Sequence, residues 1–212
     1  NIQLKNGNNV KEIFNNIDEK TLAYKFNKVN EEIKNKEFIN KRILLSGPTN
    51  VGYNYRVYRV DNKDLKTNAN LLIAANILTS KYLIPGIREK NGAYGANSGF
   101  YTDKGIFILS SYRDPEFENT YKEFENSLKN FKQENIDKED IKNAIISVVG
   151  NLYNLKNFSL KVNDSLMKEV KETKEYEENL VKEILNVTNE SLVEAISKLQ
   201  SYKDYSYHSD SH

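Results

Sequence analysis

The sequence has no cysteine, almost no histidine and almost no net charge, and each shortage excludes a class of chemistry. Without cysteine, the 212-residue chain forms neither disulfides nor thiolate-based metal or redox sites. Its only histidines, His208 and His212, lie at the C-terminus, which excludes catalysis by a histidine in the body of the fold. The 31 basic and 30 acidic residues leave a net charge of +1, so no basic surface for nucleic acid is expected.

Long hydrophobic runs are also missing. A membrane-spanning helix needs roughly 18 or more consecutive apolar residues, and the most apolar stretch, residues 70–87, contains Asn76, Lys81 and Pro85. We therefore predict a buried helix there and no association with a membrane. The first residue is not methionine and no signal-peptide core follows it, so we interpret the chain as part of a longer protein.

Hydrophobic periodicity indicates where helices and strands lie. Tyr53, Tyr55 and Val57 alternate with more polar neighbours, which is the period of a half-exposed strand. We expect strands near residues 42–46, 53–58, 93–101 and 105–112, and helices near residues 9–33, 68–83, 114–131, 137–153, 165–171, 174–185 and 189–199.

Strands gathered in the middle of the chain, with helices after them, favour an α+β fold with an antiparallel β-sheet packed against helices. We predict a single α+β domain over residues 1–200 and a flexible polar tail over residues 201–212. Pro85 and Gly86 are expected to stop one helix, and Asp114 followed by Pro115 is expected to start another.

A metal site in the tail is the first functional candidate. His208 and His212 are four residues apart with Asp210 between them, so in a helix they could share a metal. The spacing matches neither of the common zinc-binding helix motifs, and the serine-rich sequence is a poor helix former. We therefore predict no metal site in this chain.

The glycine-bearing segment 92–99 is the second candidate. It lacks the Lys-Ser/Thr ending of a phosphate-binding loop, and no helical pattern begins after it. Glycines within a strand more often mark a bulge or the close approach of another backbone. A bound peptide could be such a backbone.

Arg88 and Tyr94 form the third candidate. A guanidinium and a phenol are hydrogen-bond donors, so together they could bind a carbonyl oxygen or a developing oxyanion. In the alternative interpretation, Arg88 pairs with Glu89 or another surface acid and Tyr94 packs in the sheet. Residue chemistry alone leaves both interpretations open.

Two short strings resemble a known family. The first motif string is Arg-Glu-Lys-Asn-Gly-Ala-Tyr-Gly at residues 88–95, and the second is Ser-Tyr-Arg-Asp-Pro at residues 111–115. Together they resemble the C-terminal half of the insulinase/pitrilysin family of zinc metallopeptidases. The likeness is greatest to the presequence protease branch, which includes falcilysin-like enzymes.

The resemblance implies a fold and a mechanism. Members consist of four related α+β domains whose two halves close around an unfolded peptide, and the N-terminal half binds zinc through His-x-x-Glu-His. The C-terminal half contributes an arginine and a tyrosine that contact the substrate carbonyl. By motif position these catalytic residues are Arg88 and Tyr94, with Gly92, Ala93 and Gly95 as substrate-binding residues.

The chain itself contains no His-x-x-Glu-His. The resemblance therefore implies that zinc is the cofactor of a parent enzyme, held by an N-terminal half that is this chain's partner, and that the chain alone is inactive. Two alternatives stay open: a non-catalytic interaction subunit of the same fold, and a peptide-binding module that acts alone. The cytoplasm, the mitochondrial matrix and a plastid are all compatible compartments.

Overall fold

The computed structural model describes residues 41–47, 51–61, 64–153 and 174–209. The chain divides into two compact units, residues 1–38 and 39–212. The sequence, in contrast, predicts a single domain over residues 1–200. Every described residue belongs to the second unit. The helices predicted near residues 9–33 and 165–171 lie outside the described residues.

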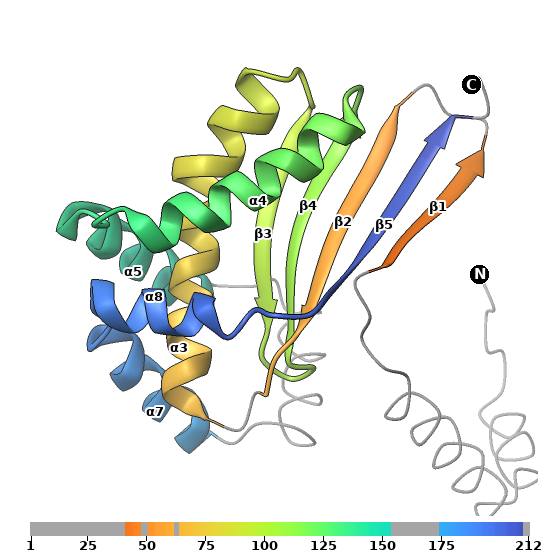
Figure 1. Ribbon diagram of the computed structural model, residues 1–212. Helices are drawn as coiled ribbons and strands as arrows, with labels where there is room; N and C mark the ends of the chain where they lie inside the picture. Colours follow the sequence, from red (N-terminus) through yellow and green to blue (C-terminus); the bar gives the residue numbers. More distant parts are fainter. Residues whose placement is uncertain (1–40, 48–50, 62–63, 154–173, 210–212) are drawn as a thin grey trace, which may run out of the picture. The chain divides into compact units, whose positions relative to one another are not determined.

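A five-stranded sheet, in the order β1-β5-β2-β4-β3, forms the framework of the second unit (Figure 1). All neighbouring strands are antiparallel except β1 and β5, which run parallel. The predicted α+β fold with a largely antiparallel sheet is therefore confirmed. The strands are β1 Lys41–Gly47, β2 Gly52–Arg59, β3 Gly95–Tyr101, β4 Ile106–Asp114 and β5 Tyr202–Ser209.

Strand β5 contradicts the prediction of a flexible tail. Residues 202–209 lie between β1 and β2 inside the sheet, not at its margin. The tail is polar, but its buried acid has a partner: Asp204 accepts two hydrogen bonds from Arg56 of β2, at 2.7 and 2.8 Å. The prediction was wrong because it rested on composition alone. A buried polar strand whose hydrogen-bond partners are distant in sequence has the same composition as a solvated tail.

Helices gather on one side of the sheet (Figure 1). Helix α4 packs on β2 and β4, and η1 packs on β3, while α3 contacts α5, α7 and α8. The buried core includes Leu71, Phe107 and Phe124. Within the described ranges, no helix is both long and apolar enough to span a membrane. The helices are α3 Leu65–Ile77, η1 Leu78–Glu89, α4 Phe117–Gln133, α5 Lys138–Leu152, α7 Lys174–Leu185 and α8 Asn189–Ser197.

The predicted stop at Pro85 and Gly86 is wrong. The helix continues from α3 as the π-helix η1 and ends at Glu89, with Pro85 inside it. The Lys90 N–H donates to the Pro85 carbonyl at 3.1 Å, which is the i→i+5 spacing of a π-helix. Leu83 and Ile87, on either side of the proline, are both fully buried, so tertiary packing keeps the chain helical despite the donor that proline lacks.

Two predicted helices begin close to their expected starts. Asp137 precedes α5 and accepts the Glu139 N–H at 3.1 Å. Asp114 lies three residues before α4, which begins at Phe117. Its side chain accepts a hydrogen bond from the Glu116 N–H at 2.9 Å. The start of α4 therefore lies three residues later than the sequence predicts.

Candidate functional site

The two motif strings, 19 residues apart at Tyr94 and Arg113, meet at one end of the sheet. The Tyr94 N–H donates to the Arg113 carbonyl at 3.3 Å. Directly after this contact, Gly95 of β3 pairs with Tyr112 of β4. The hairpin between β3 and β4 therefore places the strings side by side in antiparallel directions.

A turn around Gly92 ends η1 and joins it to β3. The Gly92 N–H donates to the backbone carbonyl of Arg88, and the Ala93 N–H donates to that of Ile87, each at 3.2 Å. The two bonds are nested as in a Schellman cap, but each spans one residue more. Gly92 has a φ of +79°, and a Cβ there would lie 3.9 Å from Pro115 of the second motif string. The left-handed conformation explains the glycine, and the turn places Arg88 and Tyr94 at its two ends.

Both candidate donors are exposed to solvent. The side chain of Tyr94 is 69% exposed, and its ring lies 5.7 Å from that of Tyr112 and 5.9 Å from the guanidinium carbon of Arg113. Arg88 is also exposed. Within the described part of the chain, the Arg88 side chain has no ion pair or hydrogen bond, with Glu89 or any other residue, and neither has the Tyr94 hydroxyl.

The three residues predicted to bind substrate differ in what they offer. Gly92 is exposed and Gly95 is half-buried, whereas the Ala93 side chain is 3% exposed and lies in the core. The Ala93 N–H is already bonded to Ile87, so only its carbonyl is left for a ligand. Their role in binding substrate stays a prediction.

Strand β3 lies at the edge of the sheet, where an added peptide strand would pair. Helix η1 closes part of this edge, because the Ser98 N–H donates to the Thr79 hydroxyl at 2.8 Å. A peptide strand therefore finds no free donor at Ser98. This contact also protects the edge against pairing with another chain.

A buried polar network includes Ser111 and Asp114 of the second motif string, and the sequence did not reveal it. The Asn54 amide donates to Ser111 at 2.9 Å and to Asp114 at 3.1 Å, and Ser206 donates to Asn54 at 3.0 Å. Thr120 of α4 also donates to Asp114. The network links β2, β4, β5 and α4, and it holds the end of β4 that carries the second motif string. The only signal in the sequence was the alternation of polar residues along β2 and β5.

A row of tyrosine rings crosses the sheet face opposite these buried residues. The Tyr112 ring lies 5.3 Å from the Tyr53 ring, which in turn lies 6.1 Å from the Tyr207 ring. With Tyr94, these rings form a continuous row from the start of β3 across β4 and β2 to β5. The sequence shows the tyrosines, but only strand pairing aligns them.

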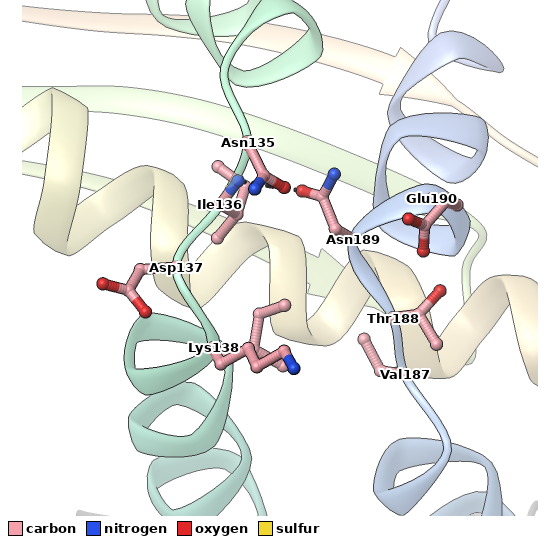
Figure 2. A pocket seen from close by; sticks show the side chains of 9 residues that line it. Asn135, Ile136, Asp137, Lys138, Val187, Thr188, Asn189 and Glu190 are labelled. Atoms are coloured by element: carbon pink, nitrogen blue, oxygen red, sulfur yellow. Dashed lines mark hydrogen bonds between the residues drawn. The ribbon is translucent and has the colours of Figure 1, made fainter.

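A surface pocket of about 840 Å³ lies away from the motif strings, between the segments before α5 and α8 (Figure 2). The Ile136 N–H donates to the Asn189 side chain at 2.9 Å, and Asp137 and Thr188 cap the two helices. The Asp137, Thr188 and Asn189 side chains at the pocket therefore already bond to the local backbone. The pocket is lined by Asn135, Ile136, Asp137, Lys138, Ile141, Val187, Thr188, Asn189 and Glu190.

Metal ligands do not converge in the described residues, where no group of three or more His, Asp or Glu side chains could hold an ion. His208 lies in strand β5, so the helical spacing that would have joined it to His212 is not present at that position. Asp210 and His212 lie outside the described residues.

A sequence model of the PreP C-terminal domain matches residues 43–206, which include both motif strings. Among curated proteins, the mitochondrial presequence protease of Aspergillus oryzae is 53% identical over 62 residues, which are 29% of this chain and 6% of that protein. The mitochondrial presequence protease of Mus musculus is 41% identical over 81 residues, 38% of this chain and 8% of that protein. These matches thus span less than a tenth of the relatives' length.

Solved structures share the fold. A protease from Helicobacter pylori superposes with a TM-score of 0.68 at 14% identity, covering 81% of this chain and 45% of that one. A protein from Pseudomonas fluorescens described as a peptidase M16 inactive domain superposes with a TM-score of 0.64 at 18% identity, covering 81% and 44%. At these identities the likeness concerns the fold alone.

Proposed function

The chain belongs to the PreP C-terminal domain family of insulinase-type peptidases, and from this premise we propose that it forms part of the substrate chamber of a zinc metalloendopeptidase that degrades unfolded peptides. The observation that carries the proposal is the meeting of the two motif strings, which leaves Arg88 and Tyr94 exposed at one turn. The names of the relatives support a protease.

In this proposal Arg88 and Tyr94 bind the scissile carbonyl of the peptide. Each side chain ends in a donor that is not used within the described part of the chain, so each can bind an oxygen without breaking an internal contact. A donor aimed at the oxygen that becomes negative stabilises the transition state more than the bound substrate. Gly92, Ala93 and Gly95 would lie along the peptide beside them.

The zinc belongs to another part of the protein. When bound, zinc supplies an activated water to peptidases of this type, but the described residues provide no set of ligands for it. We therefore place the metal in the N-terminal half of the enzyme, which is the partner of this chain, and expect the chain alone to cleave no peptide. The relatives' names favour the mitochondrial matrix among the compatible compartments.

A non-catalytic subunit of the same fold is the second candidate. The observation that favours it is the absence of His-x-x-Glu-His from this chain, since such a subunit needs no zinc site. The two candidates differ in the rest of the enzyme: a peptidase requires His-x-x-Glu-His in the complete protein or in a partner subunit, and a purely structural assembly does not. Sequencing the complete gene therefore separates them.

Tyr94→Phe tests the catalytic role directly. In the complete enzyme the change removes one donor and preserves the ring, so we expect kcat to fall about 10²–10³-fold with KM little changed. The measurement is steady-state cleavage of an unstructured peptide. Wild-type turnover in this variant would contradict the role of Tyr94.

Tyr101→Phe is the matched control. Tyr101 is 51% exposed and lies at the other end of β3, so its hydroxyl has no part in the proposed site and the variant should keep full activity. The wild-type enzyme must also lose its activity in the presence of a zinc chelator. Cleavage that persists with the chelator would overturn the proposal of a zinc peptidase.

A further inference from the structure

We infer that Arg113 is a positioning residue for Tyr94, acting through a β-bulge at the end of β4. The inference rests on the proposed function, because it assigns a further residue to the same site. The resemblance concerns Arg88 and Tyr94, whereas the case for Arg113 comes from its backbone conformation and its contacts.

Arg113 is the extra residue of a bulge. Gly52 of β2 pairs with Asp114 and Tyr53 pairs with Tyr112, so Arg113 has no partner in the β2–β4 register. Its φ is +50°, and among the described residues it is the only one other than glycine with a positive φ. Bulges of this kind usually place glycine in the left-handed conformation, and a long side chain there is strained.

Buried contacts on the C-terminal side maintain this strain. Asp114 is 1% exposed, and it accepts hydrogen bonds from Asn54, from Thr120 and from the Glu116 N–H. A regular strand would turn the side chain of Asp114 to the same face as Tyr112. The bulge instead turns Asp114 into the network and leaves both Tyr112 and Arg113 exposed.

The bulge holds Tyr94 from two directions. The Arg113 carbonyl accepts the Tyr94 N–H at 3.3 Å, which fixes the backbone. The Arg113 guanidinium carbon lies 5.9 Å from the centre of the Tyr94 ring, within the range of a cation–π contact. The Tyr112 ring meets the same ring at an angle of 69°. Glycine would adopt this backbone conformation with less strain. We therefore assign the role of the position to the arginine side chain, which contacts the Tyr94 ring.

The test compares Arg113→Gly with the wild type in the complete enzyme. Glycine accepts the left-handed conformation and removes only the side chain, so the thermal midpoint should stay equal or rise. We expect kcat to fall about two- to fivefold, in line with the loss of one exposed cation–π contact, with KM little changed. Arg113→Lys, which restores a cation, should recover part of kcat.

The decisive measurement is the double variant Arg113→Gly/Tyr94→Phe. If Arg113 acts through Tyr94, the double variant is no slower than Tyr94→Phe alone, because the positioned hydroxyl is already gone. Lys104→Gly is the matched control, since Lys104 lies 5.7 Å from the Tyr101 ring in the same kind of contact. That variant should keep full activity.

Three outcomes overturn the inference: an unchanged kcat in Arg113→Gly, losses that multiply in the double variant, or an equal loss in Lys104→Gly. The outcome is distinguishable from failure of the proposed function. If Tyr94→Phe keeps wild-type turnover, the proposed role of Tyr94 fails first. If Tyr94→Phe is slow and Arg113→Gly is not, only the positioning role fails.

Discussion

Asp64, the N-cap of α3, illustrates how one side chain makes stability depend on pH. It accepts hydrogen bonds from the backbone N–H groups of Lys66 and Thr67 and from the Thr67 hydroxyl, at 3.2, 3.1 and 2.5 Å. The hydroxyl bond is the largest cause that lowers the pKa of Asp64 below its usual value of 3.8. A carboxylate with a lowered pKa stabilises the fold above its unfolded pKa, and this contribution is lost as the pH falls through the folded value.

Asp64→Ala should lower the free energy of unfolding at pH 7 by about 1 kcal/mol, the usual value of an N-cap. Asp64→Asn preserves an acceptor, so its free energy of unfolding should match that of the wild type at pH 7. Below pH ~4, where the wild type loses stability, the variant should lose less. Urea denaturation of the 212-residue chain at several pH values measures both. A similar acid sensitivity in wild type and Asp64→Asn would contradict the role of the carboxylate.

At the scale of the element, the turn that ends η1 depends on one glycine. Gly92 has a φ of +79°, whereas Gly150 lies within helix α5, where an added Cβ would have no atom within 4 Å. Gly92→Ala should destabilise the chain by about 1–2 kcal/mol, because a Cβ disfavours the left-handed region. Gly150→Ala should stabilise it by roughly 0.5–1 kcal/mol, because alanine favours a helix.

Chemical denaturation of the two alanine variants checks this pair. Since both make the same chemical change, their opposite signs isolate the effect of backbone conformation. A stabilising Gly92→Ala would mean that the turn does not require the left-handed residue, and the junction between Arg88 and Tyr94 would then need another explanation.

Strand β2 shows why an element can be predicted when its orientation cannot. The alternation of Tyr53, Tyr55 and Val57 with Asn54 and Arg56 correctly predicts a strand. Hydrophobicity alone would bury the tyrosines, yet Asn54 and Arg56 are the buried residues and Tyr55 is 41% exposed. The polar pair can be buried because Ser111, Asp114 and Asp204 supply partners from β4 and β5, and no local pattern in the sequence encodes them.

At the scale of the whole molecule, one buried ion pair joins β2 to the C-terminal strand. Arg56 and Asp204 are 148 residues apart in the chain and contact each other through two hydrogen bonds. Burial lowers the pKa of Arg56, but the hydrogen bonds and charge of Asp204 outweigh it, so the pKa is raised and the guanidinium stays charged. The centre of the Tyr202 ring also lies 4.0 Å from the guanidinium carbon of Arg56.

Asp204→Asn should destabilise the chain by about 3–5 kcal/mol, because it leaves a buried charge without its main counter-ion. Glu194→Gln makes the same chemical change in an exposed pair with Lys198, at 3.6 Å, and should cost no more than about 0.5 kcal/mol. Denaturant titration of the chain measures both. Similar small losses in the two variants would show that β5 does not depend on the buried pair.

Within the described residues, the sequence by itself determined the α+β class, most helices, four of the five strands and the two motif strings, because each rests on a local period or a contiguous string. It also excluded catalysis by cysteine. The exclusion of a histidine in the body of the fold was wrong, because it rested on a flexible tail and His208 lies in the central strand β5. Only the tertiary structure decided that residues 202–209 form a central strand, that Pro85 stays within a helix, and that Arg113 forms a bulge beside Tyr94. The physical reason is common to all three. Each segment is locally unfavourable, because it is polar, contains proline or is strained, and contacts with residues distant in sequence compensate for this.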